Sequence, residues 1–251
     1  MIELQGRGNH REKGVFSMQT PRLFGLSIAV FTAGCQSVAG DGTVSSEVRT
    51  VGAFRSLSVG SAITASIIPG SRSLTLRADE NLLPLIETKV DGDTLVIDLA
   101  PGKRIDRFTT LQATITNDVL EGVTASGAAI VTGTATATTD FPLTISGASR
   151  TTIDSISSTS VTVDASGASA ATLEGAATSA KLTGSGASSI DLRQLPVSTA
   201  QLELSGGSQL RAQVSSHVGG SLSGASSATI IGTPTVDVAQ SGGSHLELAS
   251  P

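Results

Sequence analysis

The motif Ser166-Gly167-Ala168-Ser169 is one of seven near-identical segments that recur through the second half of this 251-residue chain. The first two residues of the seven motifs are Ser126 and Gly127, Ser146 and Gly147, Ser166 and Gly167, Ser185 and Gly186, Ser205 and Gly206, Ser223 and Gly224, and Ser241 and Gly242. From first Ser to first Ser, the steps stay near twenty and shorten slightly after Ser205. A nearly fixed period of this length indicates a solenoid, in which each repeat forms one coil and stacks on the next.

Apolar residues flank each Ser-Gly motif at every second position. Val161 and Val163 precede one motif, and Leu210 follows another. Because successive side chains of a strand point to opposite faces, this alternation predicts strands rather than helices. The charged residues that fall between the apolar positions are therefore expected to face solvent. They include Asp154, Glu174, Asp191, Arg211 and Glu247.

The repeat length suits one coil of a parallel β-helix with two or three short strands per turn. All six Phe residues lie at or before Phe141, so the repeats have only small and aliphatic side chains for a narrow core. We predict an all-β fold, a parallel β-helix (β-solenoid) with repeats of roughly 20 residues and coils about 4.8 Å apart. We also expect Ser and Thr ladders, in which each hydroxyl bonds its neighbour one coil away.

The composition excludes some classes of function. The chain has no Trp or Tyr, 28 Gly and a formal net charge of −5. An acidic chain of this kind argues against nucleic-acid binding, which needs a basic surface. With a single cysteine, Cys35, the chain has no intrachain disulfide and no cysteine-based metal site.

The first 35 residues have the pattern of a targeting segment. Residues 1–17 are interpreted as a disordered leader or an upstream extension, with Met18 as the alternative start, and residues 18–35 as a signal peptide. Arg22 precedes an apolar run of about ten residues, which is too short for a membrane-spanning helix.

The end of this segment, Thr32-Ala33-Gly34-Cys35, is similar to a bacterial lipobox, which predicts lipidation of Cys35. Gln36 follows the cysteine, and by the same resemblance a residue other than Asp there favours the outer membrane. Two alternatives remain open: an ordinary signal peptide cleaved near Ala39, which gives a periplasmic or secreted protein, and a cytoplasmic protein.

After the targeting segment we expect a tether over residues 36–46 and a β-domain over residues 47–251. The domain divides into N-terminal strands (47–118) and the repeats (119–251). Pro69-Gly70 marks a turn, and Asp91-Gly92 predicts a hairpin. Whether residues 47–118 form a separate layer or the first coils of the solenoid is left open by the sequence.

Two further stretches carry a family resemblance. They are Ala78-Asp79-Glu80-Asn81-Leu82-Leu83-Pro84-Leu85-Ile86-Glu87 and Asp91-Gly92-Asp93-Thr94-Leu95-Val96-Ile97. Together with the repeats that follow, they resemble the head GIN domain family, also called the putative auto-transporter adhesin or DUF2807 family, from about Val44 to the end. The resemblance implies a bacterial envelope protein with a right-handed parallel β-helix. It brings no established activity and no catalytic residues.

Candidate catalytic and metal-binding residues are sparse. A glycan-cleaving enzyme on a β-helix needs paired carboxylates in a groove, and Asp154, Asp164, Glu174 and Asp191 are the residues to weigh. We interpret them as solubilising charges. His10, His217 and His245 are isolated in sequence, and the serine motifs lack the Gly-x-Ser-x-Gly elbow of nucleophilic enzymes. We therefore expect no catalytic residue, no metal and no cofactor.

The sequence thus favours a non-enzymatic cell-envelope module, adhesin-like, that binds or scaffolds through a repetitive Ser/Thr/Gly surface. The expected partners are envelope glycans or a protein, with no nucleic acid and with membrane contact only through a lipid anchor. The alternatives are a carbohydrate-active enzyme on a β-helix and a purely structural protein that self-associates. Leu246 and Leu248 lie near the chain end without an obvious cap, which favours end-to-end self-association.

Overall fold

The structure, a computed structural model, describes residues 36–250, which belong to a unit that spans residues 34–251. The expected leader (1–17), the signal peptide (18–35) and the lipidation site Cys35 lie outside the described residues. Within 36–250, no helix is long and apolar enough to cross a membrane. The helical element there is a short 3₁₀ helix, η1 (Glu80–Leu85).

The remaining elements of the described part are strands. The N-terminal ones are β1 (Gln36–Ala39), β2 (Val44–Arg49), β3 (Ser56–Val59), β4 (Thr64–Ile68), β5 (Ser73–Asp79), β6 (Ile86–Asp91), β7 (Thr94–Leu99), β8 (Lys103–Arg107) and β9 (Leu111–Thr116). The repeats contain β10 (Gly122–Ala125), β11 (Ile130–Thr134), β12 (Thr138–Ile145), β13 (Arg150–Ala165), β14 (Ala170–Gly184), β15 (Ser189–Leu204), β16 (Gln209–Leu222), β17 (Ser227–Ile231), β18 (Thr235–Gln240) and β19 (His245–Ala249).

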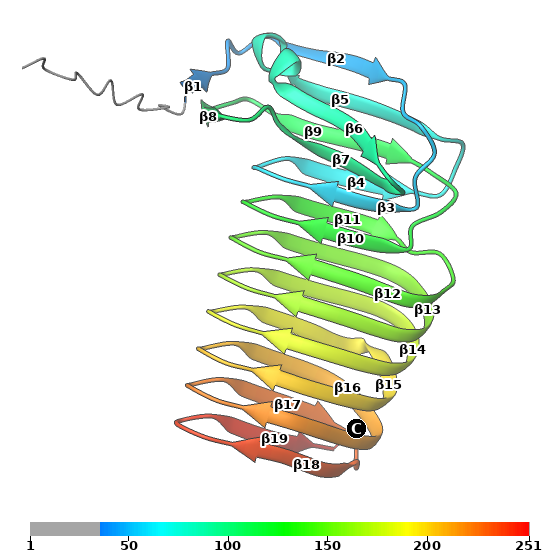
Figure 1. Cartoon of the computed structure of the whole chain (residues 1–251), viewed down its shortest axis with the longest axis vertical. Helices are drawn as coiled ribbons and strands as arrows, with labels where there is room; N and C mark the ends of the chain where they lie inside the picture. The colour runs from blue at the N-terminus through cyan, green and yellow to red at the C-terminus, as the bar shows by residue number, and fades with distance from the viewer. Residues whose placement is uncertain (1–35, 251) are drawn as a thin grey trace, which may run out of the picture. The chain divides into compact units, whose positions relative to one another are not determined.

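The repeats form the predicted β-solenoid. Each coil has two strand faces, joined by a Ser-Gly motif at a tight turn on one side and by a wider bend on the other (Figure 1). We call the face that precedes the motifs face A, the face that follows them face B, and the wide side the bend side. In β13, β14 and β15 a single strand runs from face B around the bend to face A.

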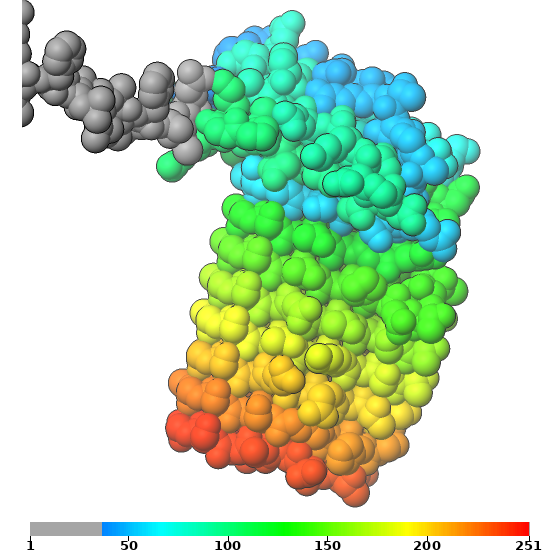
Figure 2. Space-filling view, viewed as in Figure 1, coloured from blue at the N-terminus to red at the C-terminus, as the bar shows by residue number. Residues whose placement is uncertain are grey.

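Parallel pairing places equivalent residues of successive coils in columns. On face A, one column passes through residues that are all buried: Leu57, Val123, Leu143, Val163, Leu182 and Leu202. Such columns are the core, and their burial removes apolar surface from water along the whole stack. Of the charged residues expected on the surface, Asp154, Arg211 and Glu247 are exposed, whereas Glu174 and Asp191 are partly buried. Figure 2 shows the coils packed closely against one another along the viewed face.

The N-terminal strands continue the stack, but not in chain order. β3 and β4 form a coil that pairs with β10 and β11 on one side and with β7 and β9 on the other. The chain therefore forms the coil of β3 and β4 first and the coil of β7 and β9 second. It then passes the coil of β3 and β4 again and continues into β10, where the repeats begin. The returning segment is held beside residues 53–55: the Asn117 side chain donates to the Phe54 carbonyl at 3.1 Å, and Arg55 Nε donates to Glu121 at 2.6 Å.

Antiparallel strands lie at the N-terminal end of the stack. β5 pairs with both β2 and β9, and β6 and β7 form the hairpin predicted at Asp91-Gly92, where Gly92 has a φ of 57°. Arg49 of β2 covers part of the edge of β6, because its guanidinium donates to the carbonyls of Leu83, at 2.8 Å, and Ile86. This end of the stack therefore differs from the repeats in both strand direction and edge protection.

The segment 36–46, expected to be a tether, is instead fastened to the domain. β1 pairs in parallel with β8, and residues 44–46 already belong to β2. The Asn81 side chain donates to the Ala39 carbonyl at 2.8 Å, and the Glu80 amide donates to the Thr43 carbonyl at 2.8 Å. The Gly and Ser residues that suggested a flexible linker serve short strands and a turn at Gly42, where φ is 83°.

Candidate functional site

The seven predicted motif positions lie at the tight turns, where their glycines form a column. Each motif glycine has a φ between 69° and 73°. The amide that follows it donates to the glycine carbonyl of the preceding coil; for example, Ala168 donates to Gly147 and Ala187 to Gly167, both at 2.7 Å. A Cβ on Gly167 would lie 2.6 Å from the Gly147 carbonyl oxygen. The column therefore requires glycine for both its backbone conformation and its close contact.

The hydroxyls of these turns do not form the expected ladder from one side chain to the next. The fourth residue of the motif is buried, as in Ser149 and Ser226, and its hydroxyl donates to the carbonyl of the motif's first Ser, Ser146 or Ser223, at 2.8 Å. Longer contacts reach carbonyls of the preceding coil, as from Ser208 to Gly184 at 3.4 Å and from Ser244 to Leu222 at 3.2 Å. Backbone carbonyls, within the turn and in the preceding coil, therefore take the place of neighbouring hydroxyls as acceptors. The hydroxyls of Ser169 and Ser188 are buried without a partner.

An eighth, altered motif lies in the coil of β3 and β4. Gly60-Ser61-Ala62 occupies the turn there, and the Ala128 amide donates to the Ser61 carbonyl at 2.7 Å, as in the glycine column. Ser61 has a φ of 57°, which is unfavourable for a residue with a Cβ. Its hydroxyl donates to Asp98 at 2.7 Å. Sequence inspection missed this motif because the Gly and the Ser are exchanged.

Face A carries a shallow polar depression of about 370 Å³. Residues of four successive coils line it, among them Ser160, Lys181, Gln201 and His217. His217 Nδ1 lies 3.0 Å from the Thr235 hydroxyl of the next coil. The depression can form hydrogen bonds, but the described residues lining it include no Phe, Tyr or Trp ring on which a sugar would stack.

The bend side carries a second hollow, of about 320 Å³, at a step in coil length. The coil that starts at Ser185 ends at Leu204, whereas the one that starts at Ser205 ends at Leu222 and is two positions shorter. The register of β15 and β16 shifts between Leu192 and Val197, so the longer coil stands out beyond the shorter one. The hollow forms beneath this projection.

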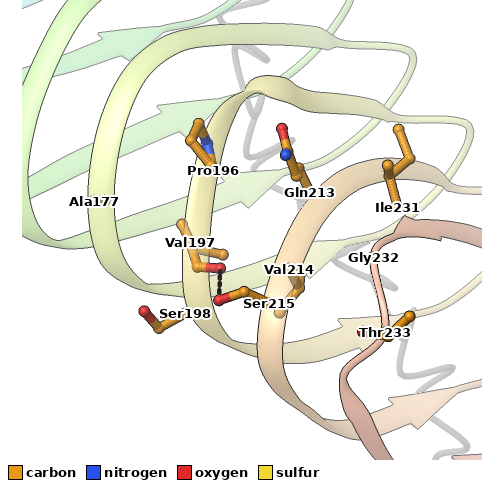
Figure 3. Close-up of a pocket in the computed structure, with 10 residues that line it drawn as sticks. All are labelled: Ala177, Pro196, Val197, Ser198, Gln213, Val214, Ser215, Ile231, Gly232 and Thr233. Carbon is orange, nitrogen blue, oxygen red and sulfur yellow. Dashed lines mark hydrogen bonds between the residues drawn. The ribbon is translucent and has the colours of Figure 1, made fainter. Parts of the chain in front are cut away.

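The lining of this hollow is mixed (Figure 3). Val197 and Val214 are buried, whereas Gln213, Ser215 and Thr233 are exposed. The Ser215 hydroxyl reaches the Val197 carbonyl at 3.5 Å across the two coils (Figure 3). An apolar floor with a few hydrogen-bonding groups at its margin is the usual composition of a ligand site. No sequence motif marks it, and the signal that could have found it is the shortening of the period after Ser205.

An ion-paired cluster lies on face B. Asp191 and Arg193 form a salt bridge of 2.6 Å, and Arg211 is the register partner of Asp191 in the next coil. The hydrogen bond from Arg193 lowers the pKa of Asp191, with partial burial opposing the shift and the charges of Arg193 and Arg211 adding to it. The same contact raises the pKa of Arg193. This cluster joins two coils at the surface.

The four carboxylates weighed as catalytic groups do not share one face of the solenoid. Asp164 lies on face A, whereas Asp191 lies on face B beside Arg211 of the next coil. The other two have polar register partners: Asp154 pairs with Thr134, and Glu174 pairs with Gln194. Within residues 36–250, no group of three or more His, Cys, Asp and Glu side chains is placed to hold a metal ion.

The histidines within the described part are also separate, since His217 pairs with Thr199 and Thr235, whereas His245 pairs with Ser227 of β17. His10 and Cys35 lie outside residues 36–250.

The model of the family called "Putative auto-transporter adhesin, head GIN domain" matches residues 53–234. No functionally curated protein matches the chain.

Crystal structures of other proteins share the fold. One is of a putative adhesin from Bacteroides fragilis, with a TM-score of 0.73 and 20% identity, covering 84% of this chain and 100% of that one. A second is of a putative adhesin from Parabacteroides distasonis, with a TM-score of 0.62 and 17% identity, covering 84% and 100%. A third, of a putative lipid binding protein from Parabacteroides distasonis, has a TM-score of 0.66 and 14% identity, covering 85% and 100%.

Proposed function

Because the chain belongs to the head GIN domain family, we propose that it is a non-enzymatic binding module of the bacterial cell envelope, adhesin-like in action. In this proposal residues 1–17 are a leader or an upstream extension, residues 18–35 are a signal peptide, and a lipid on Cys35 holds the β-domain at the outer membrane. The ligand is an envelope glycan or a segment of a protein partner.

The observation that carries the proposal is the hollow at the step in coil length. It combines buried Val197 and Val214 with exposed Gln213 and Thr233, so it offers both apolar contact and hydrogen bonds. The separation of Asp164, Glu174 and Asp191 supports a binding role over a glycan-cleaving one, because such cleavage needs two carboxylates within one groove.

The full chain would be incubated with isolated envelope polysaccharides and with peptidoglycan, and the soluble products would be analysed in the same tubes. We expect saturable retention without release of oligosaccharides. Release of oligosaccharides would overturn the non-enzymatic assignment. If neither retention nor release is observed, the glycans are excluded as ligands and the protein partner is favoured.

A matched pair of variants tests the hollow itself. Thr233→Arg places a long side chain at the margin of the hollow, and we expect it to lower retention at least tenfold. Ala137→Arg changes an exposed residue on the same bend side, two coils from the nearest lining residue, Ala177, and should bind as the unmodified chain does. Equal binding by both variants would exclude the hollow as the contact surface.

The anchor is tested separately. Cys35→Ser should move the chain from the membrane fraction to the soluble fraction, and mass spectrometry of the N-terminal peptide should lose the mass of the lipid. An unmodified Cys35 in the original chain would contradict the lipoprotein assignment and favour the periplasmic or secreted one.

A second candidate function, structural self-association, is favoured by one observation. The terminal strands β18 and β19 each pair on one side within the described residues, and they carry the exposed side chains of Val236 and Leu248.

A further inference from the structure

We propose that the loop of residues 100–110, together with β1, forms a platform that binds the anionic phospholipid headgroups of a membrane and inserts Phe108 into the bilayer interface. This inference goes beyond the proposed function, in which the lipid on Cys35 makes the membrane contact. The inference rests on the proposed function only because that function places the β-domain beside a membrane.

The loop stands at the point where the chain enters the domain. It takes the place of a Ser-Gly motif between β7 and β9, and it contains β8. The parallel pairing of β1 with β8 sets Gln36 opposite Lys103 and Ser37 opposite Arg104. Cys35 is bonded to Gln36, so an anchor on Cys35 starts within roughly 4 Å of the residue that pairs with Lys103.

The loop carries a local positive charge on an acidic chain. Lys103, Arg104 and Arg107 are three of the 16 Lys and Arg residues, and they lie within one short strand. Asp106 offsets one of these charges; it lies 3.9 Å from Arg104 in a pair whose side chains are 74% and 54% exposed. Exposed pairs of this kind are weak, so they leave the guanidinium free to exchange partners. Each cation close to an anionic leaflet is worth about a fivefold gain in binding.

The same loop presents apolar surface next to the cations. Phe108 is 42% exposed, which is unusual for a large aromatic residue. A hollow of about 220 Å³ lies beside it, lined among others by Leu99, Ile105 and Leu111, and also by Lys103 and Arg104. Cations and apolar groups side by side match the interface of a bilayer, where phosphates lie directly above acyl chains.

The platform is held in shape by buried and local hydrogen bonds. The Asp79 carboxylate is buried and accepts from the Thr109 amide at 3.0 Å. The Gly40 amide donates to the Arg107 carbonyl at 2.8 Å, which closes the end of the β1–β8 pair. A surface held in this way loses little conformational freedom on binding, which favours a lasting contact.

The chain itself allows a test that does not depend on natural lipidation. Because it has no Trp and no Tyr, a Phe108→Trp variant contains a single indole. Because Cys35 is the only cysteine, the thiol of the full chain can be coupled to a maleimide lipid in vesicles, which replaces the natural anchor. Vesicles of phosphatidylcholine and phosphatidylglycerol in equal parts, with brominated acyl chains, then quench any indole that enters the bilayer.

We expect the fluorescence of Trp in the Phe108→Trp variant to shift to the blue and to be quenched. The matched control is Ile68→Trp, at a residue 52% exposed at the end of β4, which should show neither effect. Adding Arg104→Gln and Arg107→Gln to the Phe108→Trp variant should weaken binding of the uncoupled chain to these vesicles by about tenfold or more at low salt.

The outcomes separate the two proposals. An unquenched indole at position 108 in the coupled chain, or equal quenching at positions 108 and 68, overturns the platform whatever the fate of Cys35 in the cell. Quenching at 108 alone supports the platform, even where mass spectrometry finds no natural lipid. Circular dichroism with the strand spectrum of the original chain confirms that each variant is folded.

Discussion

At the scale of single residues, the turn glycines carry two constraints that can be separated within one motif. Gly206 has a φ of 69°, and a Cβ there would lie 2.7 Å from the Gly186 carbonyl oxygen. At the next residue, Gly207, the nearest atom to a Cβ would be that same oxygen at 3.8 Å, and other motifs have Ala at this position. Position 206 therefore cannot accommodate a side chain, whereas position 207 can.

We predict that Gly206→Ala lowers the free energy of unfolding by about 2–4 kcal/mol, from the left-handed backbone and the forced contact together. Gly207→Ala should change it by less than about 0.5 kcal/mol. Urea denaturation followed by circular dichroism measures both. If both variants lose a similar free energy of unfolding, the glycine column can move to accommodate a Cβ at position 206, contrary to this prediction.

The Asp191–Arg193 pair leads to a pH-dependent prediction. The pKa of Asp191 is lower in the folded chain than its ordinary value of 3.8, so the folded state favours the ionised carboxylate. The pair therefore contributes stability above about pH 4, and this contribution is lost as the pH falls through the lowered folded pKa. We expect Asp191→Asn to lower Tm at pH 7. The difference in Tm between this variant and the original chain should disappear at acidic pH.

Arg193→Gln is the companion variant for this test, since it removes the same hydrogen bond from the other side. It should follow the pH profile of Asp191→Asn, as measured by thermal unfolding between pH 2 and 7. A gap that stays constant over this range would show that packing of the side chain, rather than its charge, stabilises the fold.

At the scale of elements, β1 depends on one polar side chain of η1. The Asn81 amide group donates to the Ala39 carbonyl at 2.8 Å and its oxygen accepts from the Asp41 amide at 3.1 Å. We predict that Asn81→Ala speeds hydrogen exchange of the amides of residues 36–43 by about tenfold, because each such bond is worth about 1 kcal/mol. Exchange mass spectrometry should find β14 unchanged.

Asn81→Asp is the graded control, since it keeps the acceptor for Asp41 but loses the donor to Ala39. Its exchange rates should fall between those of the original chain and of Asn81→Ala. If Asn81→Ala leaves the exchange of residues 36–43 unaltered, the β1–β8 pairing alone holds the segment.

The repeat elements were predictable from the sequence because each depends on local pattern. The alternation around Leu202 and Leu204 and the glycine at Gly206 recur in every coil, so one rule serves the whole stack. The out-of-order coil of β7 and β9 was not predictable, because pairing of Leu57 with Leu95 depends on contacts distant in sequence. The tether at 36–46 was misjudged for the same reason: composition does not reveal that β8 offers a partner.

The hollow at the step in coil length could not be predicted from the sequence pattern alone. The shortening of the coil that starts at Ser205 is visible in the sequence, but the hollow depends on where along the coil the chain is shortened. The register shift near Val197 places that loss on the bend side rather than on a face.

At the scale of the whole β-domain, the two ends of the stack differ. Antiparallel strands and η1 occupy the N-terminal end. At the other end, β18 and β19 have no partner on their outer edges among residues 36–250, and they carry the exposed Val236 and Leu248. If these edges pair with a second copy, the product is a dimer rather than a filament, because one end alone offers parallel coils.

We predict that light scattering on a sizing column gives a dimer mass at high protein concentration. A Val236→Lys and Leu248→Lys double variant should give a monomer mass, because charges at a strand edge oppose pairing. Lys in place of Val48, which is 76% exposed on β2, is the control and should still dimerise. A monomer mass for the original chain at every concentration would exclude this association.

The return of the chain past its first coil has a consequence for synthesis and export. The coil of residues 56–68 finds its neighbour on one side in residues 94–116 and on the other in residues 122–134. A chain that emerges from its N-terminus must therefore hold this coil without a parallel neighbour, open to proteases and chaperones, until residues 94–116 have followed. Once residue 134 has emerged, each further repeat adds one coil to a finished template, so the risk of misfolding is concentrated before that point.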